Sequence, residues 1–215
     1  MRPGIRPSAR ERRRETARGL LERFDLEGVG GWAAAEPQAA HTLQRLLFDA
    51  DELVAWRAVE AMGHVAAALG RGGPEPVREL VRRTLWLMND ESGGLLWQGP
   101  QVVGAVLAHL PALCGELGSV LASFLEEEPF RAGTRWGLWR LSKVAPEVVR
   151  ASARELDASF GDPDPSVRGH AALALRGAGL PVPDLAADRG AFRLFDFRAG
   201  ELEETTVAEV AARTF

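Results

Sequence analysis

The stretch that says most about the fold is Asp162-Pro163-Asp164-Pro165-Ser166-Val167-Arg168-Gly169-His170-Ala171. From Val167 it forms part of an octet, 167–174, whose pattern recurs at 56–63, 97–104 and 130–137. Each octet opens with a large apolar residue, has Arg or Gln second, an apolar residue seventh and Gly or Ala eighth. The octets start 41, 33 and 37 residues apart, which is the spacing of repeats built from two helices.

The octet pattern predicts one helix in each repeat. Positions one and eight are seven residues apart, so they share a helix face, and a small eighth residue lets neighbouring helices approach closely. An amphipathic stretch precedes each octet and is expected to form its partner helix: 37–48, 74–88, 113–126 and 146–160. The sequence therefore predicts an all-α protein in which about four helix pairs stack on one another, none of them stable alone.

These residues resemble HEAT-type repeats, over roughly residues 37–179. The resemblance implies a right-handed HEAT-like α-solenoid and says little about function. The segment 86–94, with Trp97 and Pro100, is similar to one in a family of small prokaryotic HEAT-repeat proteins that are often labelled as phycobilisome-lyase-like. In that family the next helix tends to carry acidic residues, whereas Gln101 and Ala105 occupy those positions here. This departure weakens any metal-binding or acid–base role that the resemblance would imply.

The N-terminal part of the chain is expected to add one helix. Ser8, followed by Glu11 three residues later, predicts a capping box for a helix that begins near Ala9. Three glycines are expected to end that helix: Gly28, Gly30 and Gly31.

The C-terminal part changes character after two prolines, Pro181 and Pro183. Residues 191–197 and 202–207 read as two strands around a turn at 198–201, and a short helix is expected from Ala208. We therefore expect a helical repeat domain at 1–180 and, at 181–215, a β-hairpin and short helix that cap the end of the solenoid. The edge of the hairpin could also pair with another chain, which leaves the oligomeric state open.

Net charge, cysteine count and the distribution of apolar residues argue against several classes of partner and site. A net charge of −4 over 215 residues argues against nucleic acid as the general partner. The single cysteine, Cys114, excludes an internal disulfide and a cysteine-based zinc site. No apolar core follows the basic N-terminus, and the longest uncharged run, 92–115, contains polar residues and prolines. We therefore expect no signal peptide, no membrane span and a cytoplasmic protein.

The strongest candidate site is the segment from Asn89 to Leu96, between the two predicted helices of the second repeat. It is rich in polar residues and glycine and is flanked by Trp86 and Trp97. Such a loop could form a polar pocket with aromatic walls, in which Asn89, Asp90 and Glu91 would contact the ligand. The alternative is that these residues only end one helix and turn the chain.

Two further groups are candidate binding residues. The second residues of the octets, Arg57, Gln98, Arg131 and Arg168, could line a groove for acidic segments or phosphate, or pair with the acids of the inter-helix turns. Trp139 and Arg140 follow Trp136 within one helical turn and could form stacked contacts, whereas Trp136 itself is expected in the core. Seven arginines occur within residues 1–18, interrupted by Glu11 and Glu15. They could contact nucleic acid or an acidic protein, but we interpret them as part of a solvated first helix.

The sequence shows no pattern of catalytic residues. Glu60 and His64 have a spacing that can hold a metal ion, but two ligands are too few, and His41, His109 and His170 are scattered along the chain. We therefore expect a non-catalytic protein without a cofactor or metal. The leading hypothesis is a binding or scaffold module that presents a concave helical surface to an unknown protein partner. The alternatives are a lyase-like small-molecule or cofactor binder with its pocket at the Asn89–Leu96 loop and, with least support, a nucleic-acid binder.

Overall fold

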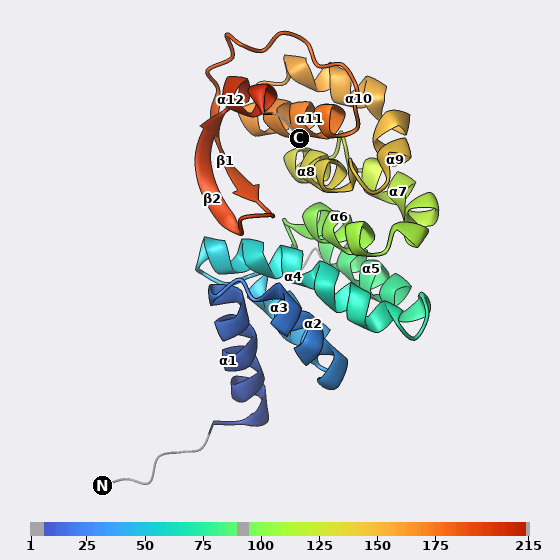
Figure 1. Ribbon diagram of the computed structural model, residues 1–215, viewed down its shortest axis with the longest axis vertical. Helices are drawn as coiled ribbons and strands as arrows, with labels where there is room; N and C mark the ends of the chain where they lie inside the picture. Colours follow the sequence, from blue (N-terminus) through green and yellow to red (C-terminus); the bar gives the residue numbers. More distant parts are fainter. Residues whose placement is uncertain (1–6, 90–94, 214–215) are drawn as a thin grey trace, which may run out of the picture.

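The computed structural model describes residues 7–89 and 95–213, which are mostly helical with one small antiparallel sheet (Figure 1). In chain order the helices are α1 (Ala9–Glu22), α2 (Leu26–Ala35), α3 (Ala39–Leu46), α4 (Glu52–Gly70), α5 (Glu75–Met88), α6 (Gly99–His109), α7 (Cys114–Ala122), α8 (Arg131–Leu141), α9 (Pro146–Ala151), α10 (Ala153–Ala158), α11 (Pro165–Gly177) and α12 (Val207–Ala212). Two 3₁₀ turns, η1 (Pro111–Leu113) and η2 (Ser159–Gly161), precede α7 and follow α10.

The four predicted octet helices are confirmed as α4, α6, α8 and α11, except that α6 begins at Gly99 and α8 at Arg131, so the first residues of these octets, Trp97 and Phe130, lie before their helices. Each packs on the next in the series, and each also packs on the helix that the preceding amphipathic stretch forms: α3, α5, α7 or the pair α9 and α10. The eighth positions of the second and third octets, Gly104 and Gly137, face one another across the α6–α8 contact. A Cβ on Gly104 would lie 2.5 Å from the Cα of Gly137, so the absence of a side chain sets how closely these helices approach.

The helix starts follow the caps that the sequence offers. The predicted capping box is confirmed, since the Ser8 hydroxyl accepts from the Glu11 amide and the Glu11 carboxylate accepts from the Ser8 amide. Two acids of the inter-helix turns cap the helices that follow them: Asp51 accepts from the amides of Leu53 and Val54 at α4, and Asp164 accepts from the Ser166 amide at α11. An acidic residue therefore begins two of the octet helices, whereas the N-cap residues of α6 and α8, Gln98 and Phe130, form no side-chain cap hydrogen bond.

The prediction that glycines end the first helix was wrong, because Gly28, Gly30 and Gly31 lie inside a second helix, α2. The break comes earlier, at Phe24, whose φ of 50° is left-handed. Asp25 then starts α2 by accepting a hydrogen bond from the Gly28 amide at 2.8 Å. Packing of α2 against α4 outweighs the low helix propensity of the glycines.

The predicted β-hairpin is confirmed. Strands β1 (Ala191–Asp196) and β2 (Glu201–Thr206) pair antiparallel, with Ala191 opposite Thr206 and Asp196 opposite Glu201. Helix α12 follows directly and packs on α11.

The position of the hairpin differs from the expected end cap. It runs along one side of the stack, from α11 back to α4, as Figure 1 shows. Phe195 of β1 stacks on Trp56 of α4, with ring centroids 5.3 Å apart, and its carbonyl oxygen accepts from Trp136 Nε1 of α8 at 3.2 Å. The apolar residues of β1 thus cover the large rings on the octet helices, which is where most apolar surface is available.

No single helix within the described ranges is long and apolar enough to cross a membrane. Only α6 together with the segment Pro111–Ala122 meets the length and composition test, and the two are bent by 115° relative to one another.

Candidate functional site

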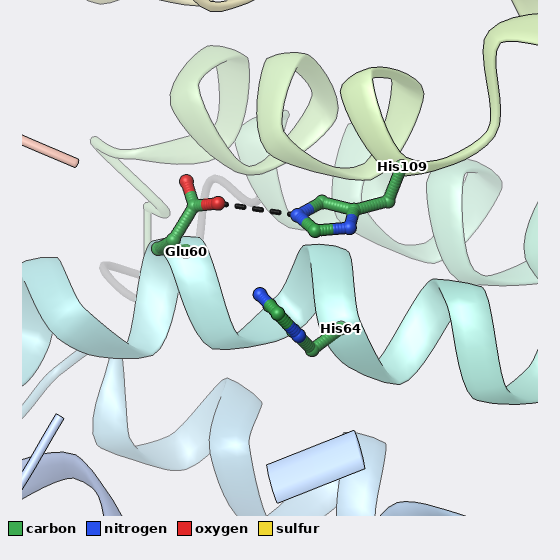
Figure 2. A group of neighbouring side chains, drawn as sticks. All are labelled: Glu60, His64 and His109. Atoms are coloured by element: carbon green, nitrogen blue, oxygen red, sulfur yellow. Dashed lines mark hydrogen bonds and ion pairs between the residues drawn. The ribbon is translucent and has the colours of Figure 1, made fainter. Parts of the chain in front are cut away.

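A buried cluster of charged and imidazole groups joins three of the stacked helices. Glu60 of α4 is 2% exposed, and both of its carboxylate oxygens bind Arg140 of α8: Nε donates at 3.0 Å and a terminal nitrogen at 2.6 Å. His109, the last residue of α6, places Nε2 3.2 Å from Glu60 Oε1 (Figure 2). Arg140 also lies over the ring of Phe197, 4.2 Å from its centroid.

His64 completes the cluster from α4, one helical turn after Glu60. Its ring lies 4.4 Å from that of His109, and Figure 2 shows both rings on the same side of α4 as Glu60. Gly63 makes this approach possible, because a Cβ there would lie 2.4 Å from His109 Cδ2. One ligand atom from each of Glu60, His64 and His109 falls within 4.8 Å of the others.

The surroundings set the protonation states of this cluster. Burial opposes the charge of Glu60, but hydrogen bonds from His109 and Arg140 outweigh it and lower the pKa of Glu60. Burial and the neighbouring His109 lower the pKa of His64. At neutral pH Glu60 is therefore an anion and His64 a neutral imidazole with a lone pair.

A second charged feature is a cleft of about 660 Å³ between α1 and α3. Its lining is rich in arginine and includes one exposed aromatic ring: Arg10, Arg13, Arg14, Gln38, His41, Thr42, Arg45, Phe48, Asp49 and Ala50. Asp49 binds Arg14 at 3.3 Å and Arg18 at 2.7 Å. Arg10, Arg13 and Arg45 form no ion pair with any residue that the structure describes.

The pKa of His41 reflects the positive charge of this cleft. Partial burial and the charges of nearby arginines lower its pKa; these arginines are Arg83, Arg45, Arg10 and Arg13. Four guanidinium groups from three helices therefore act on one imidazole. The local positive charge contrasts with the net charge of −4 for the whole chain.

An apolar hollow continues the cleft. Phe48, Asp49 and Ala50 line both. The hollow of about 360 Å³ adds Leu47, two residues of α4 and three residues that precede α6: Glu52, Ala55, Leu96, Trp97 and Gln98. The side chains of Phe48 and Trp97 are 52% and 63% exposed. Exposed aromatic rings beside unpaired arginines form a continuous surface, which we call the α1–α3 surface.

The predicted loop site lies mostly outside the described residues, since these exclude Asp90 and Glu91. Asn89 is exposed, and its side-chain amide donates to the carbonyl of Leu85 at 2.8 Å, which ends α5. Trp86 is 66% exposed. Of the residues predicted for this loop, Trp86 and Trp97 lie on the surface, and the side chain of Asn89 hydrogen-bonds to the last turn of α5.

The other predicted binding residues hold the protein together. Arg57 donates to backbone carbonyls of α1 and the hairpin, and Arg131 pairs with Glu128 and Asp162. Trp139 is 3% exposed and packs against Phe197. Arg57 and Trp139 are buried, and Arg131 is held in ion pairs. Arg168, the fourth member of the series, pairs with Asp188.

Sequence reasoning missed His109 as a partner of Glu60 and His64. The two sequence positions that the resemblance makes interesting, Gln101 and Ala105, are buried at helix contacts instead. The backbone carbonyl of Ala105 lies against Gly63, and Gln101 packs on Gly133. The sequence did contain a signal for His109. It follows Ala105 by one turn of α6, so it lies on the same face of that helix as Ala105, which contacts Gly63 of α4.

No protein-family model, curated protein or solved structure matches the chain. The similarity to HEAT repeats therefore rests on the residues of this chain alone.

Proposed function

We propose that the chain is a non-catalytic binding module, a right-handed HEAT-like solenoid of about four helix pairs, whose α1–α3 surface docks an acidic segment of a protein partner. One observation carries the proposal: the cleft lined by Arg10, Arg13 and Arg45 runs directly into the hollow formed by Phe48 and Trp97.

The composition of this surface favours a protein ligand. Arginine and large aromatic residues are enriched at protein interfaces and provide most of the binding energy in many of them. Guanidinium groups bind carboxylates through paired hydrogen bonds, and the exposed rings of Phe48 and Trp97 offer a place for an apolar anchor. An acidic segment with one apolar side chain matches both features.

The proposed docking site is not on the concave helical face that the sequence led us to expect. The hairpin covers the large rings of α4 and α8, since Trp56 and Trp136 pack on Phe195. A partner would have to displace it to reach them. The α1–α3 surface is accessible as it stands.

The test compares protein captured from source-cell lysate by three forms of the full chain. The cleft variant carries Arg10→Ser, Arg13→Ser and Arg45→Ser. The matched control carries Arg71→Ser, Arg154→Ser and Arg189→Ser, which are exposed and remove the same charge elsewhere. A nuclease-treated lysate is used, and crosslinking maps the captured segment.

The proposal expects a protein bound by wild type and control, lost with the cleft variant, and crosslinked through an acidic segment. Adding that segment as a peptide should raise the pKa of His41 in NMR titrations, because carboxylates offset the arginine charges. Equal capture by all three forms would remove the α1–α3 surface as the docking site. Capture that nuclease abolishes would indicate nucleic acid, and a melting temperature raised only by a small molecule would favour the pocket alternative.

A further inference from the structure

We propose that Glu60, His64 and His109 bind a divalent transition-metal ion of the zinc class. The proposal is independent of the docking surface, because the cluster lies on α4 and α6 and shares no residue with the α1–α3 cleft.

The ligand set suits such an ion. Two imidazoles and one carboxylate are the protein ligands of many zinc sites, which keep a further position for water or another ligand. In a tetrahedral site with metal–ligand bonds of about 2.1 Å, ligand atoms lie about 3.4 Å apart. The distance from Glu60 Oε1 to His109 Nε2 is already 3.2 Å.

The third ligand needs only a small movement. The ligand atoms lie within 4.8 Å of one another, so a shift of at most about 1.4 Å in the His64 ring brings all three to the separation of about 3.4 Å that a tetrahedral site requires. His64 is half-buried and forms no hydrogen bond within the part of the chain described, so its rotation breaks none. The side chain of His109 is 22% exposed, which leaves a route for the ion from solvent.

The charges around the site set its affinity. Glu60 supplies one negative charge, and Glu27 of α2 contributes a weaker field at His64. Arg140 binds both oxygens of Glu60 and supplies a positive charge beside the ligand atoms. The Nη2 atom of Arg140 lies 2.6 Å from Glu60 Oε1 and 3.4 Å from His109 Nε2, so an ion held between these two ligand atoms requires the guanidinium to move aside. Repulsion from the same guanidinium lowers the affinity.

The test is titration of tag-free, chelator-treated full chain with Co²⁺ at neutral pH. The visible absorption of the bound ion reports its coordination, and Zn²⁺ competition follows. We expect one ion per chain, with affinity lowered at least tenfold by His64→Ala and by His109→Ala. His41→Ala, an exposed histidine outside the cluster, should leave the affinity unchanged. Far-ultraviolet circular dichroism checks that each variant is folded.

Arg140→Met distinguishes a metal site from a purely structural ion pair. Removing the guanidinium should raise the affinity at least tenfold, because the carboxylate loses its competing cation. No binding by wild type at 1 mM Co²⁺ would overturn the proposal, even if Arg140→Met bound the ion, because Arg140 would then already fill the site. Binding that His64→Ala leaves unchanged would overturn it as well.

Discussion

Arg57, on the first octet helix, donates a hydrogen bond of 2.7 Å from Nε to the carbonyl oxygen of Gly200, at the turn of the hairpin. The same guanidinium donates to the carbonyls of Leu21 and Glu22 at the end of α1 and pairs with Glu201. One buried side chain therefore joins the beginning of the chain, the first repeat and the C-terminal hairpin.

Replacing this side chain should loosen all three parts. Arg57→Ala removes the buried side-chain donor from the carbonyl oxygens of Glu22 and Gly200, while that of Leu21 keeps the Phe24 amide, and is expected to reduce the free energy of unfolding by about 3 kcal/mol. Urea unfolding measures the loss, and hydrogen exchange should show β1 losing protection before α8. Arg82→Ala, which removes only exposed ion pairs, should change stability by less than about 0.5 kcal/mol. Equal stability of the two variants would show that the hairpin is held by its aromatic contacts alone.

Adding a methyl group should have opposite effects at two helical glycines. Gly104→Ala drives a Cβ to 2.5 Å from Gly137 and is expected to lower the free energy of unfolding by about 2 kcal/mol. Gly31→Ala, in α2, places its Cβ in open space and should raise it by about 0.5 to 1 kcal/mol. Chemical denaturation of both variants beside wild type is the measurement. A stable Gly104→Ala variant would mean that α6 and α8 can separate without cost.

The helices could be predicted because their signals are local. Caps such as Ser8 and Asp164, and the spacing of apolar residues, act within one or two turns. The α2 helix was missed because glycine normally ends a helix, and only packing against α4 explains why it does not do so here.

The candidate sites could not be predicted in the same way. His109 and Glu60 are 49 residues apart, and their contact depends on how closely α4 and α6 approach across Gly63. The arginine cleft gathers Arg10 and Arg13 from one helix and Arg45 from another, so neither stretch of sequence shows the charge that they form together. Long-range packing decides both sites.

The only cysteine should be inert in the folded protein. Burial raises the pKa of Cys114 to about 11, so at pH 8 about 0.1% of it is thiolate, the reactive form. We expect iodoacetamide to alkylate it at least 100-fold more slowly than in 8 M urea, as followed by mass spectrometry. As a control, Ser119→Cys in a Cys114→Ala background presents an exposed thiol on the same helix and should react fast. Comparable rates for the two thiols would show that α7 opens readily.

His170 should make the protein less stable in mild acid. Its ring is buried and packs against Phe192, with centroids 5.4 Å apart, and neither ring nitrogen has a hydrogen-bond partner among the residues that the structure describes. Burial lowers its pKa from 6.5 to about 4. As pH falls below 6.5, His170 binds a proton in the unfolded chain but stays neutral in the folded protein, so stability is lost progressively between pH 6.5 and 4. The loss from this group reaches about 3 kcal/mol.

Carboxylates also titrate in this range, so the test is a difference between proteins. His170→Leu keeps the site apolar and removes the titrating group, and its unfolding free energy should fall less steeply between pH 6.5 and 4 than that of wild type. His41→Gln, at an exposed position, should keep most of the wild-type slope. If His170→Leu and wild type lose stability in parallel, the ring is already solvated or hydrogen-bonded in solution. If they diverge as expected, hydrogen exchange at pH 5 should show the first opening at β1, because Phe192 of this strand packs against the ring.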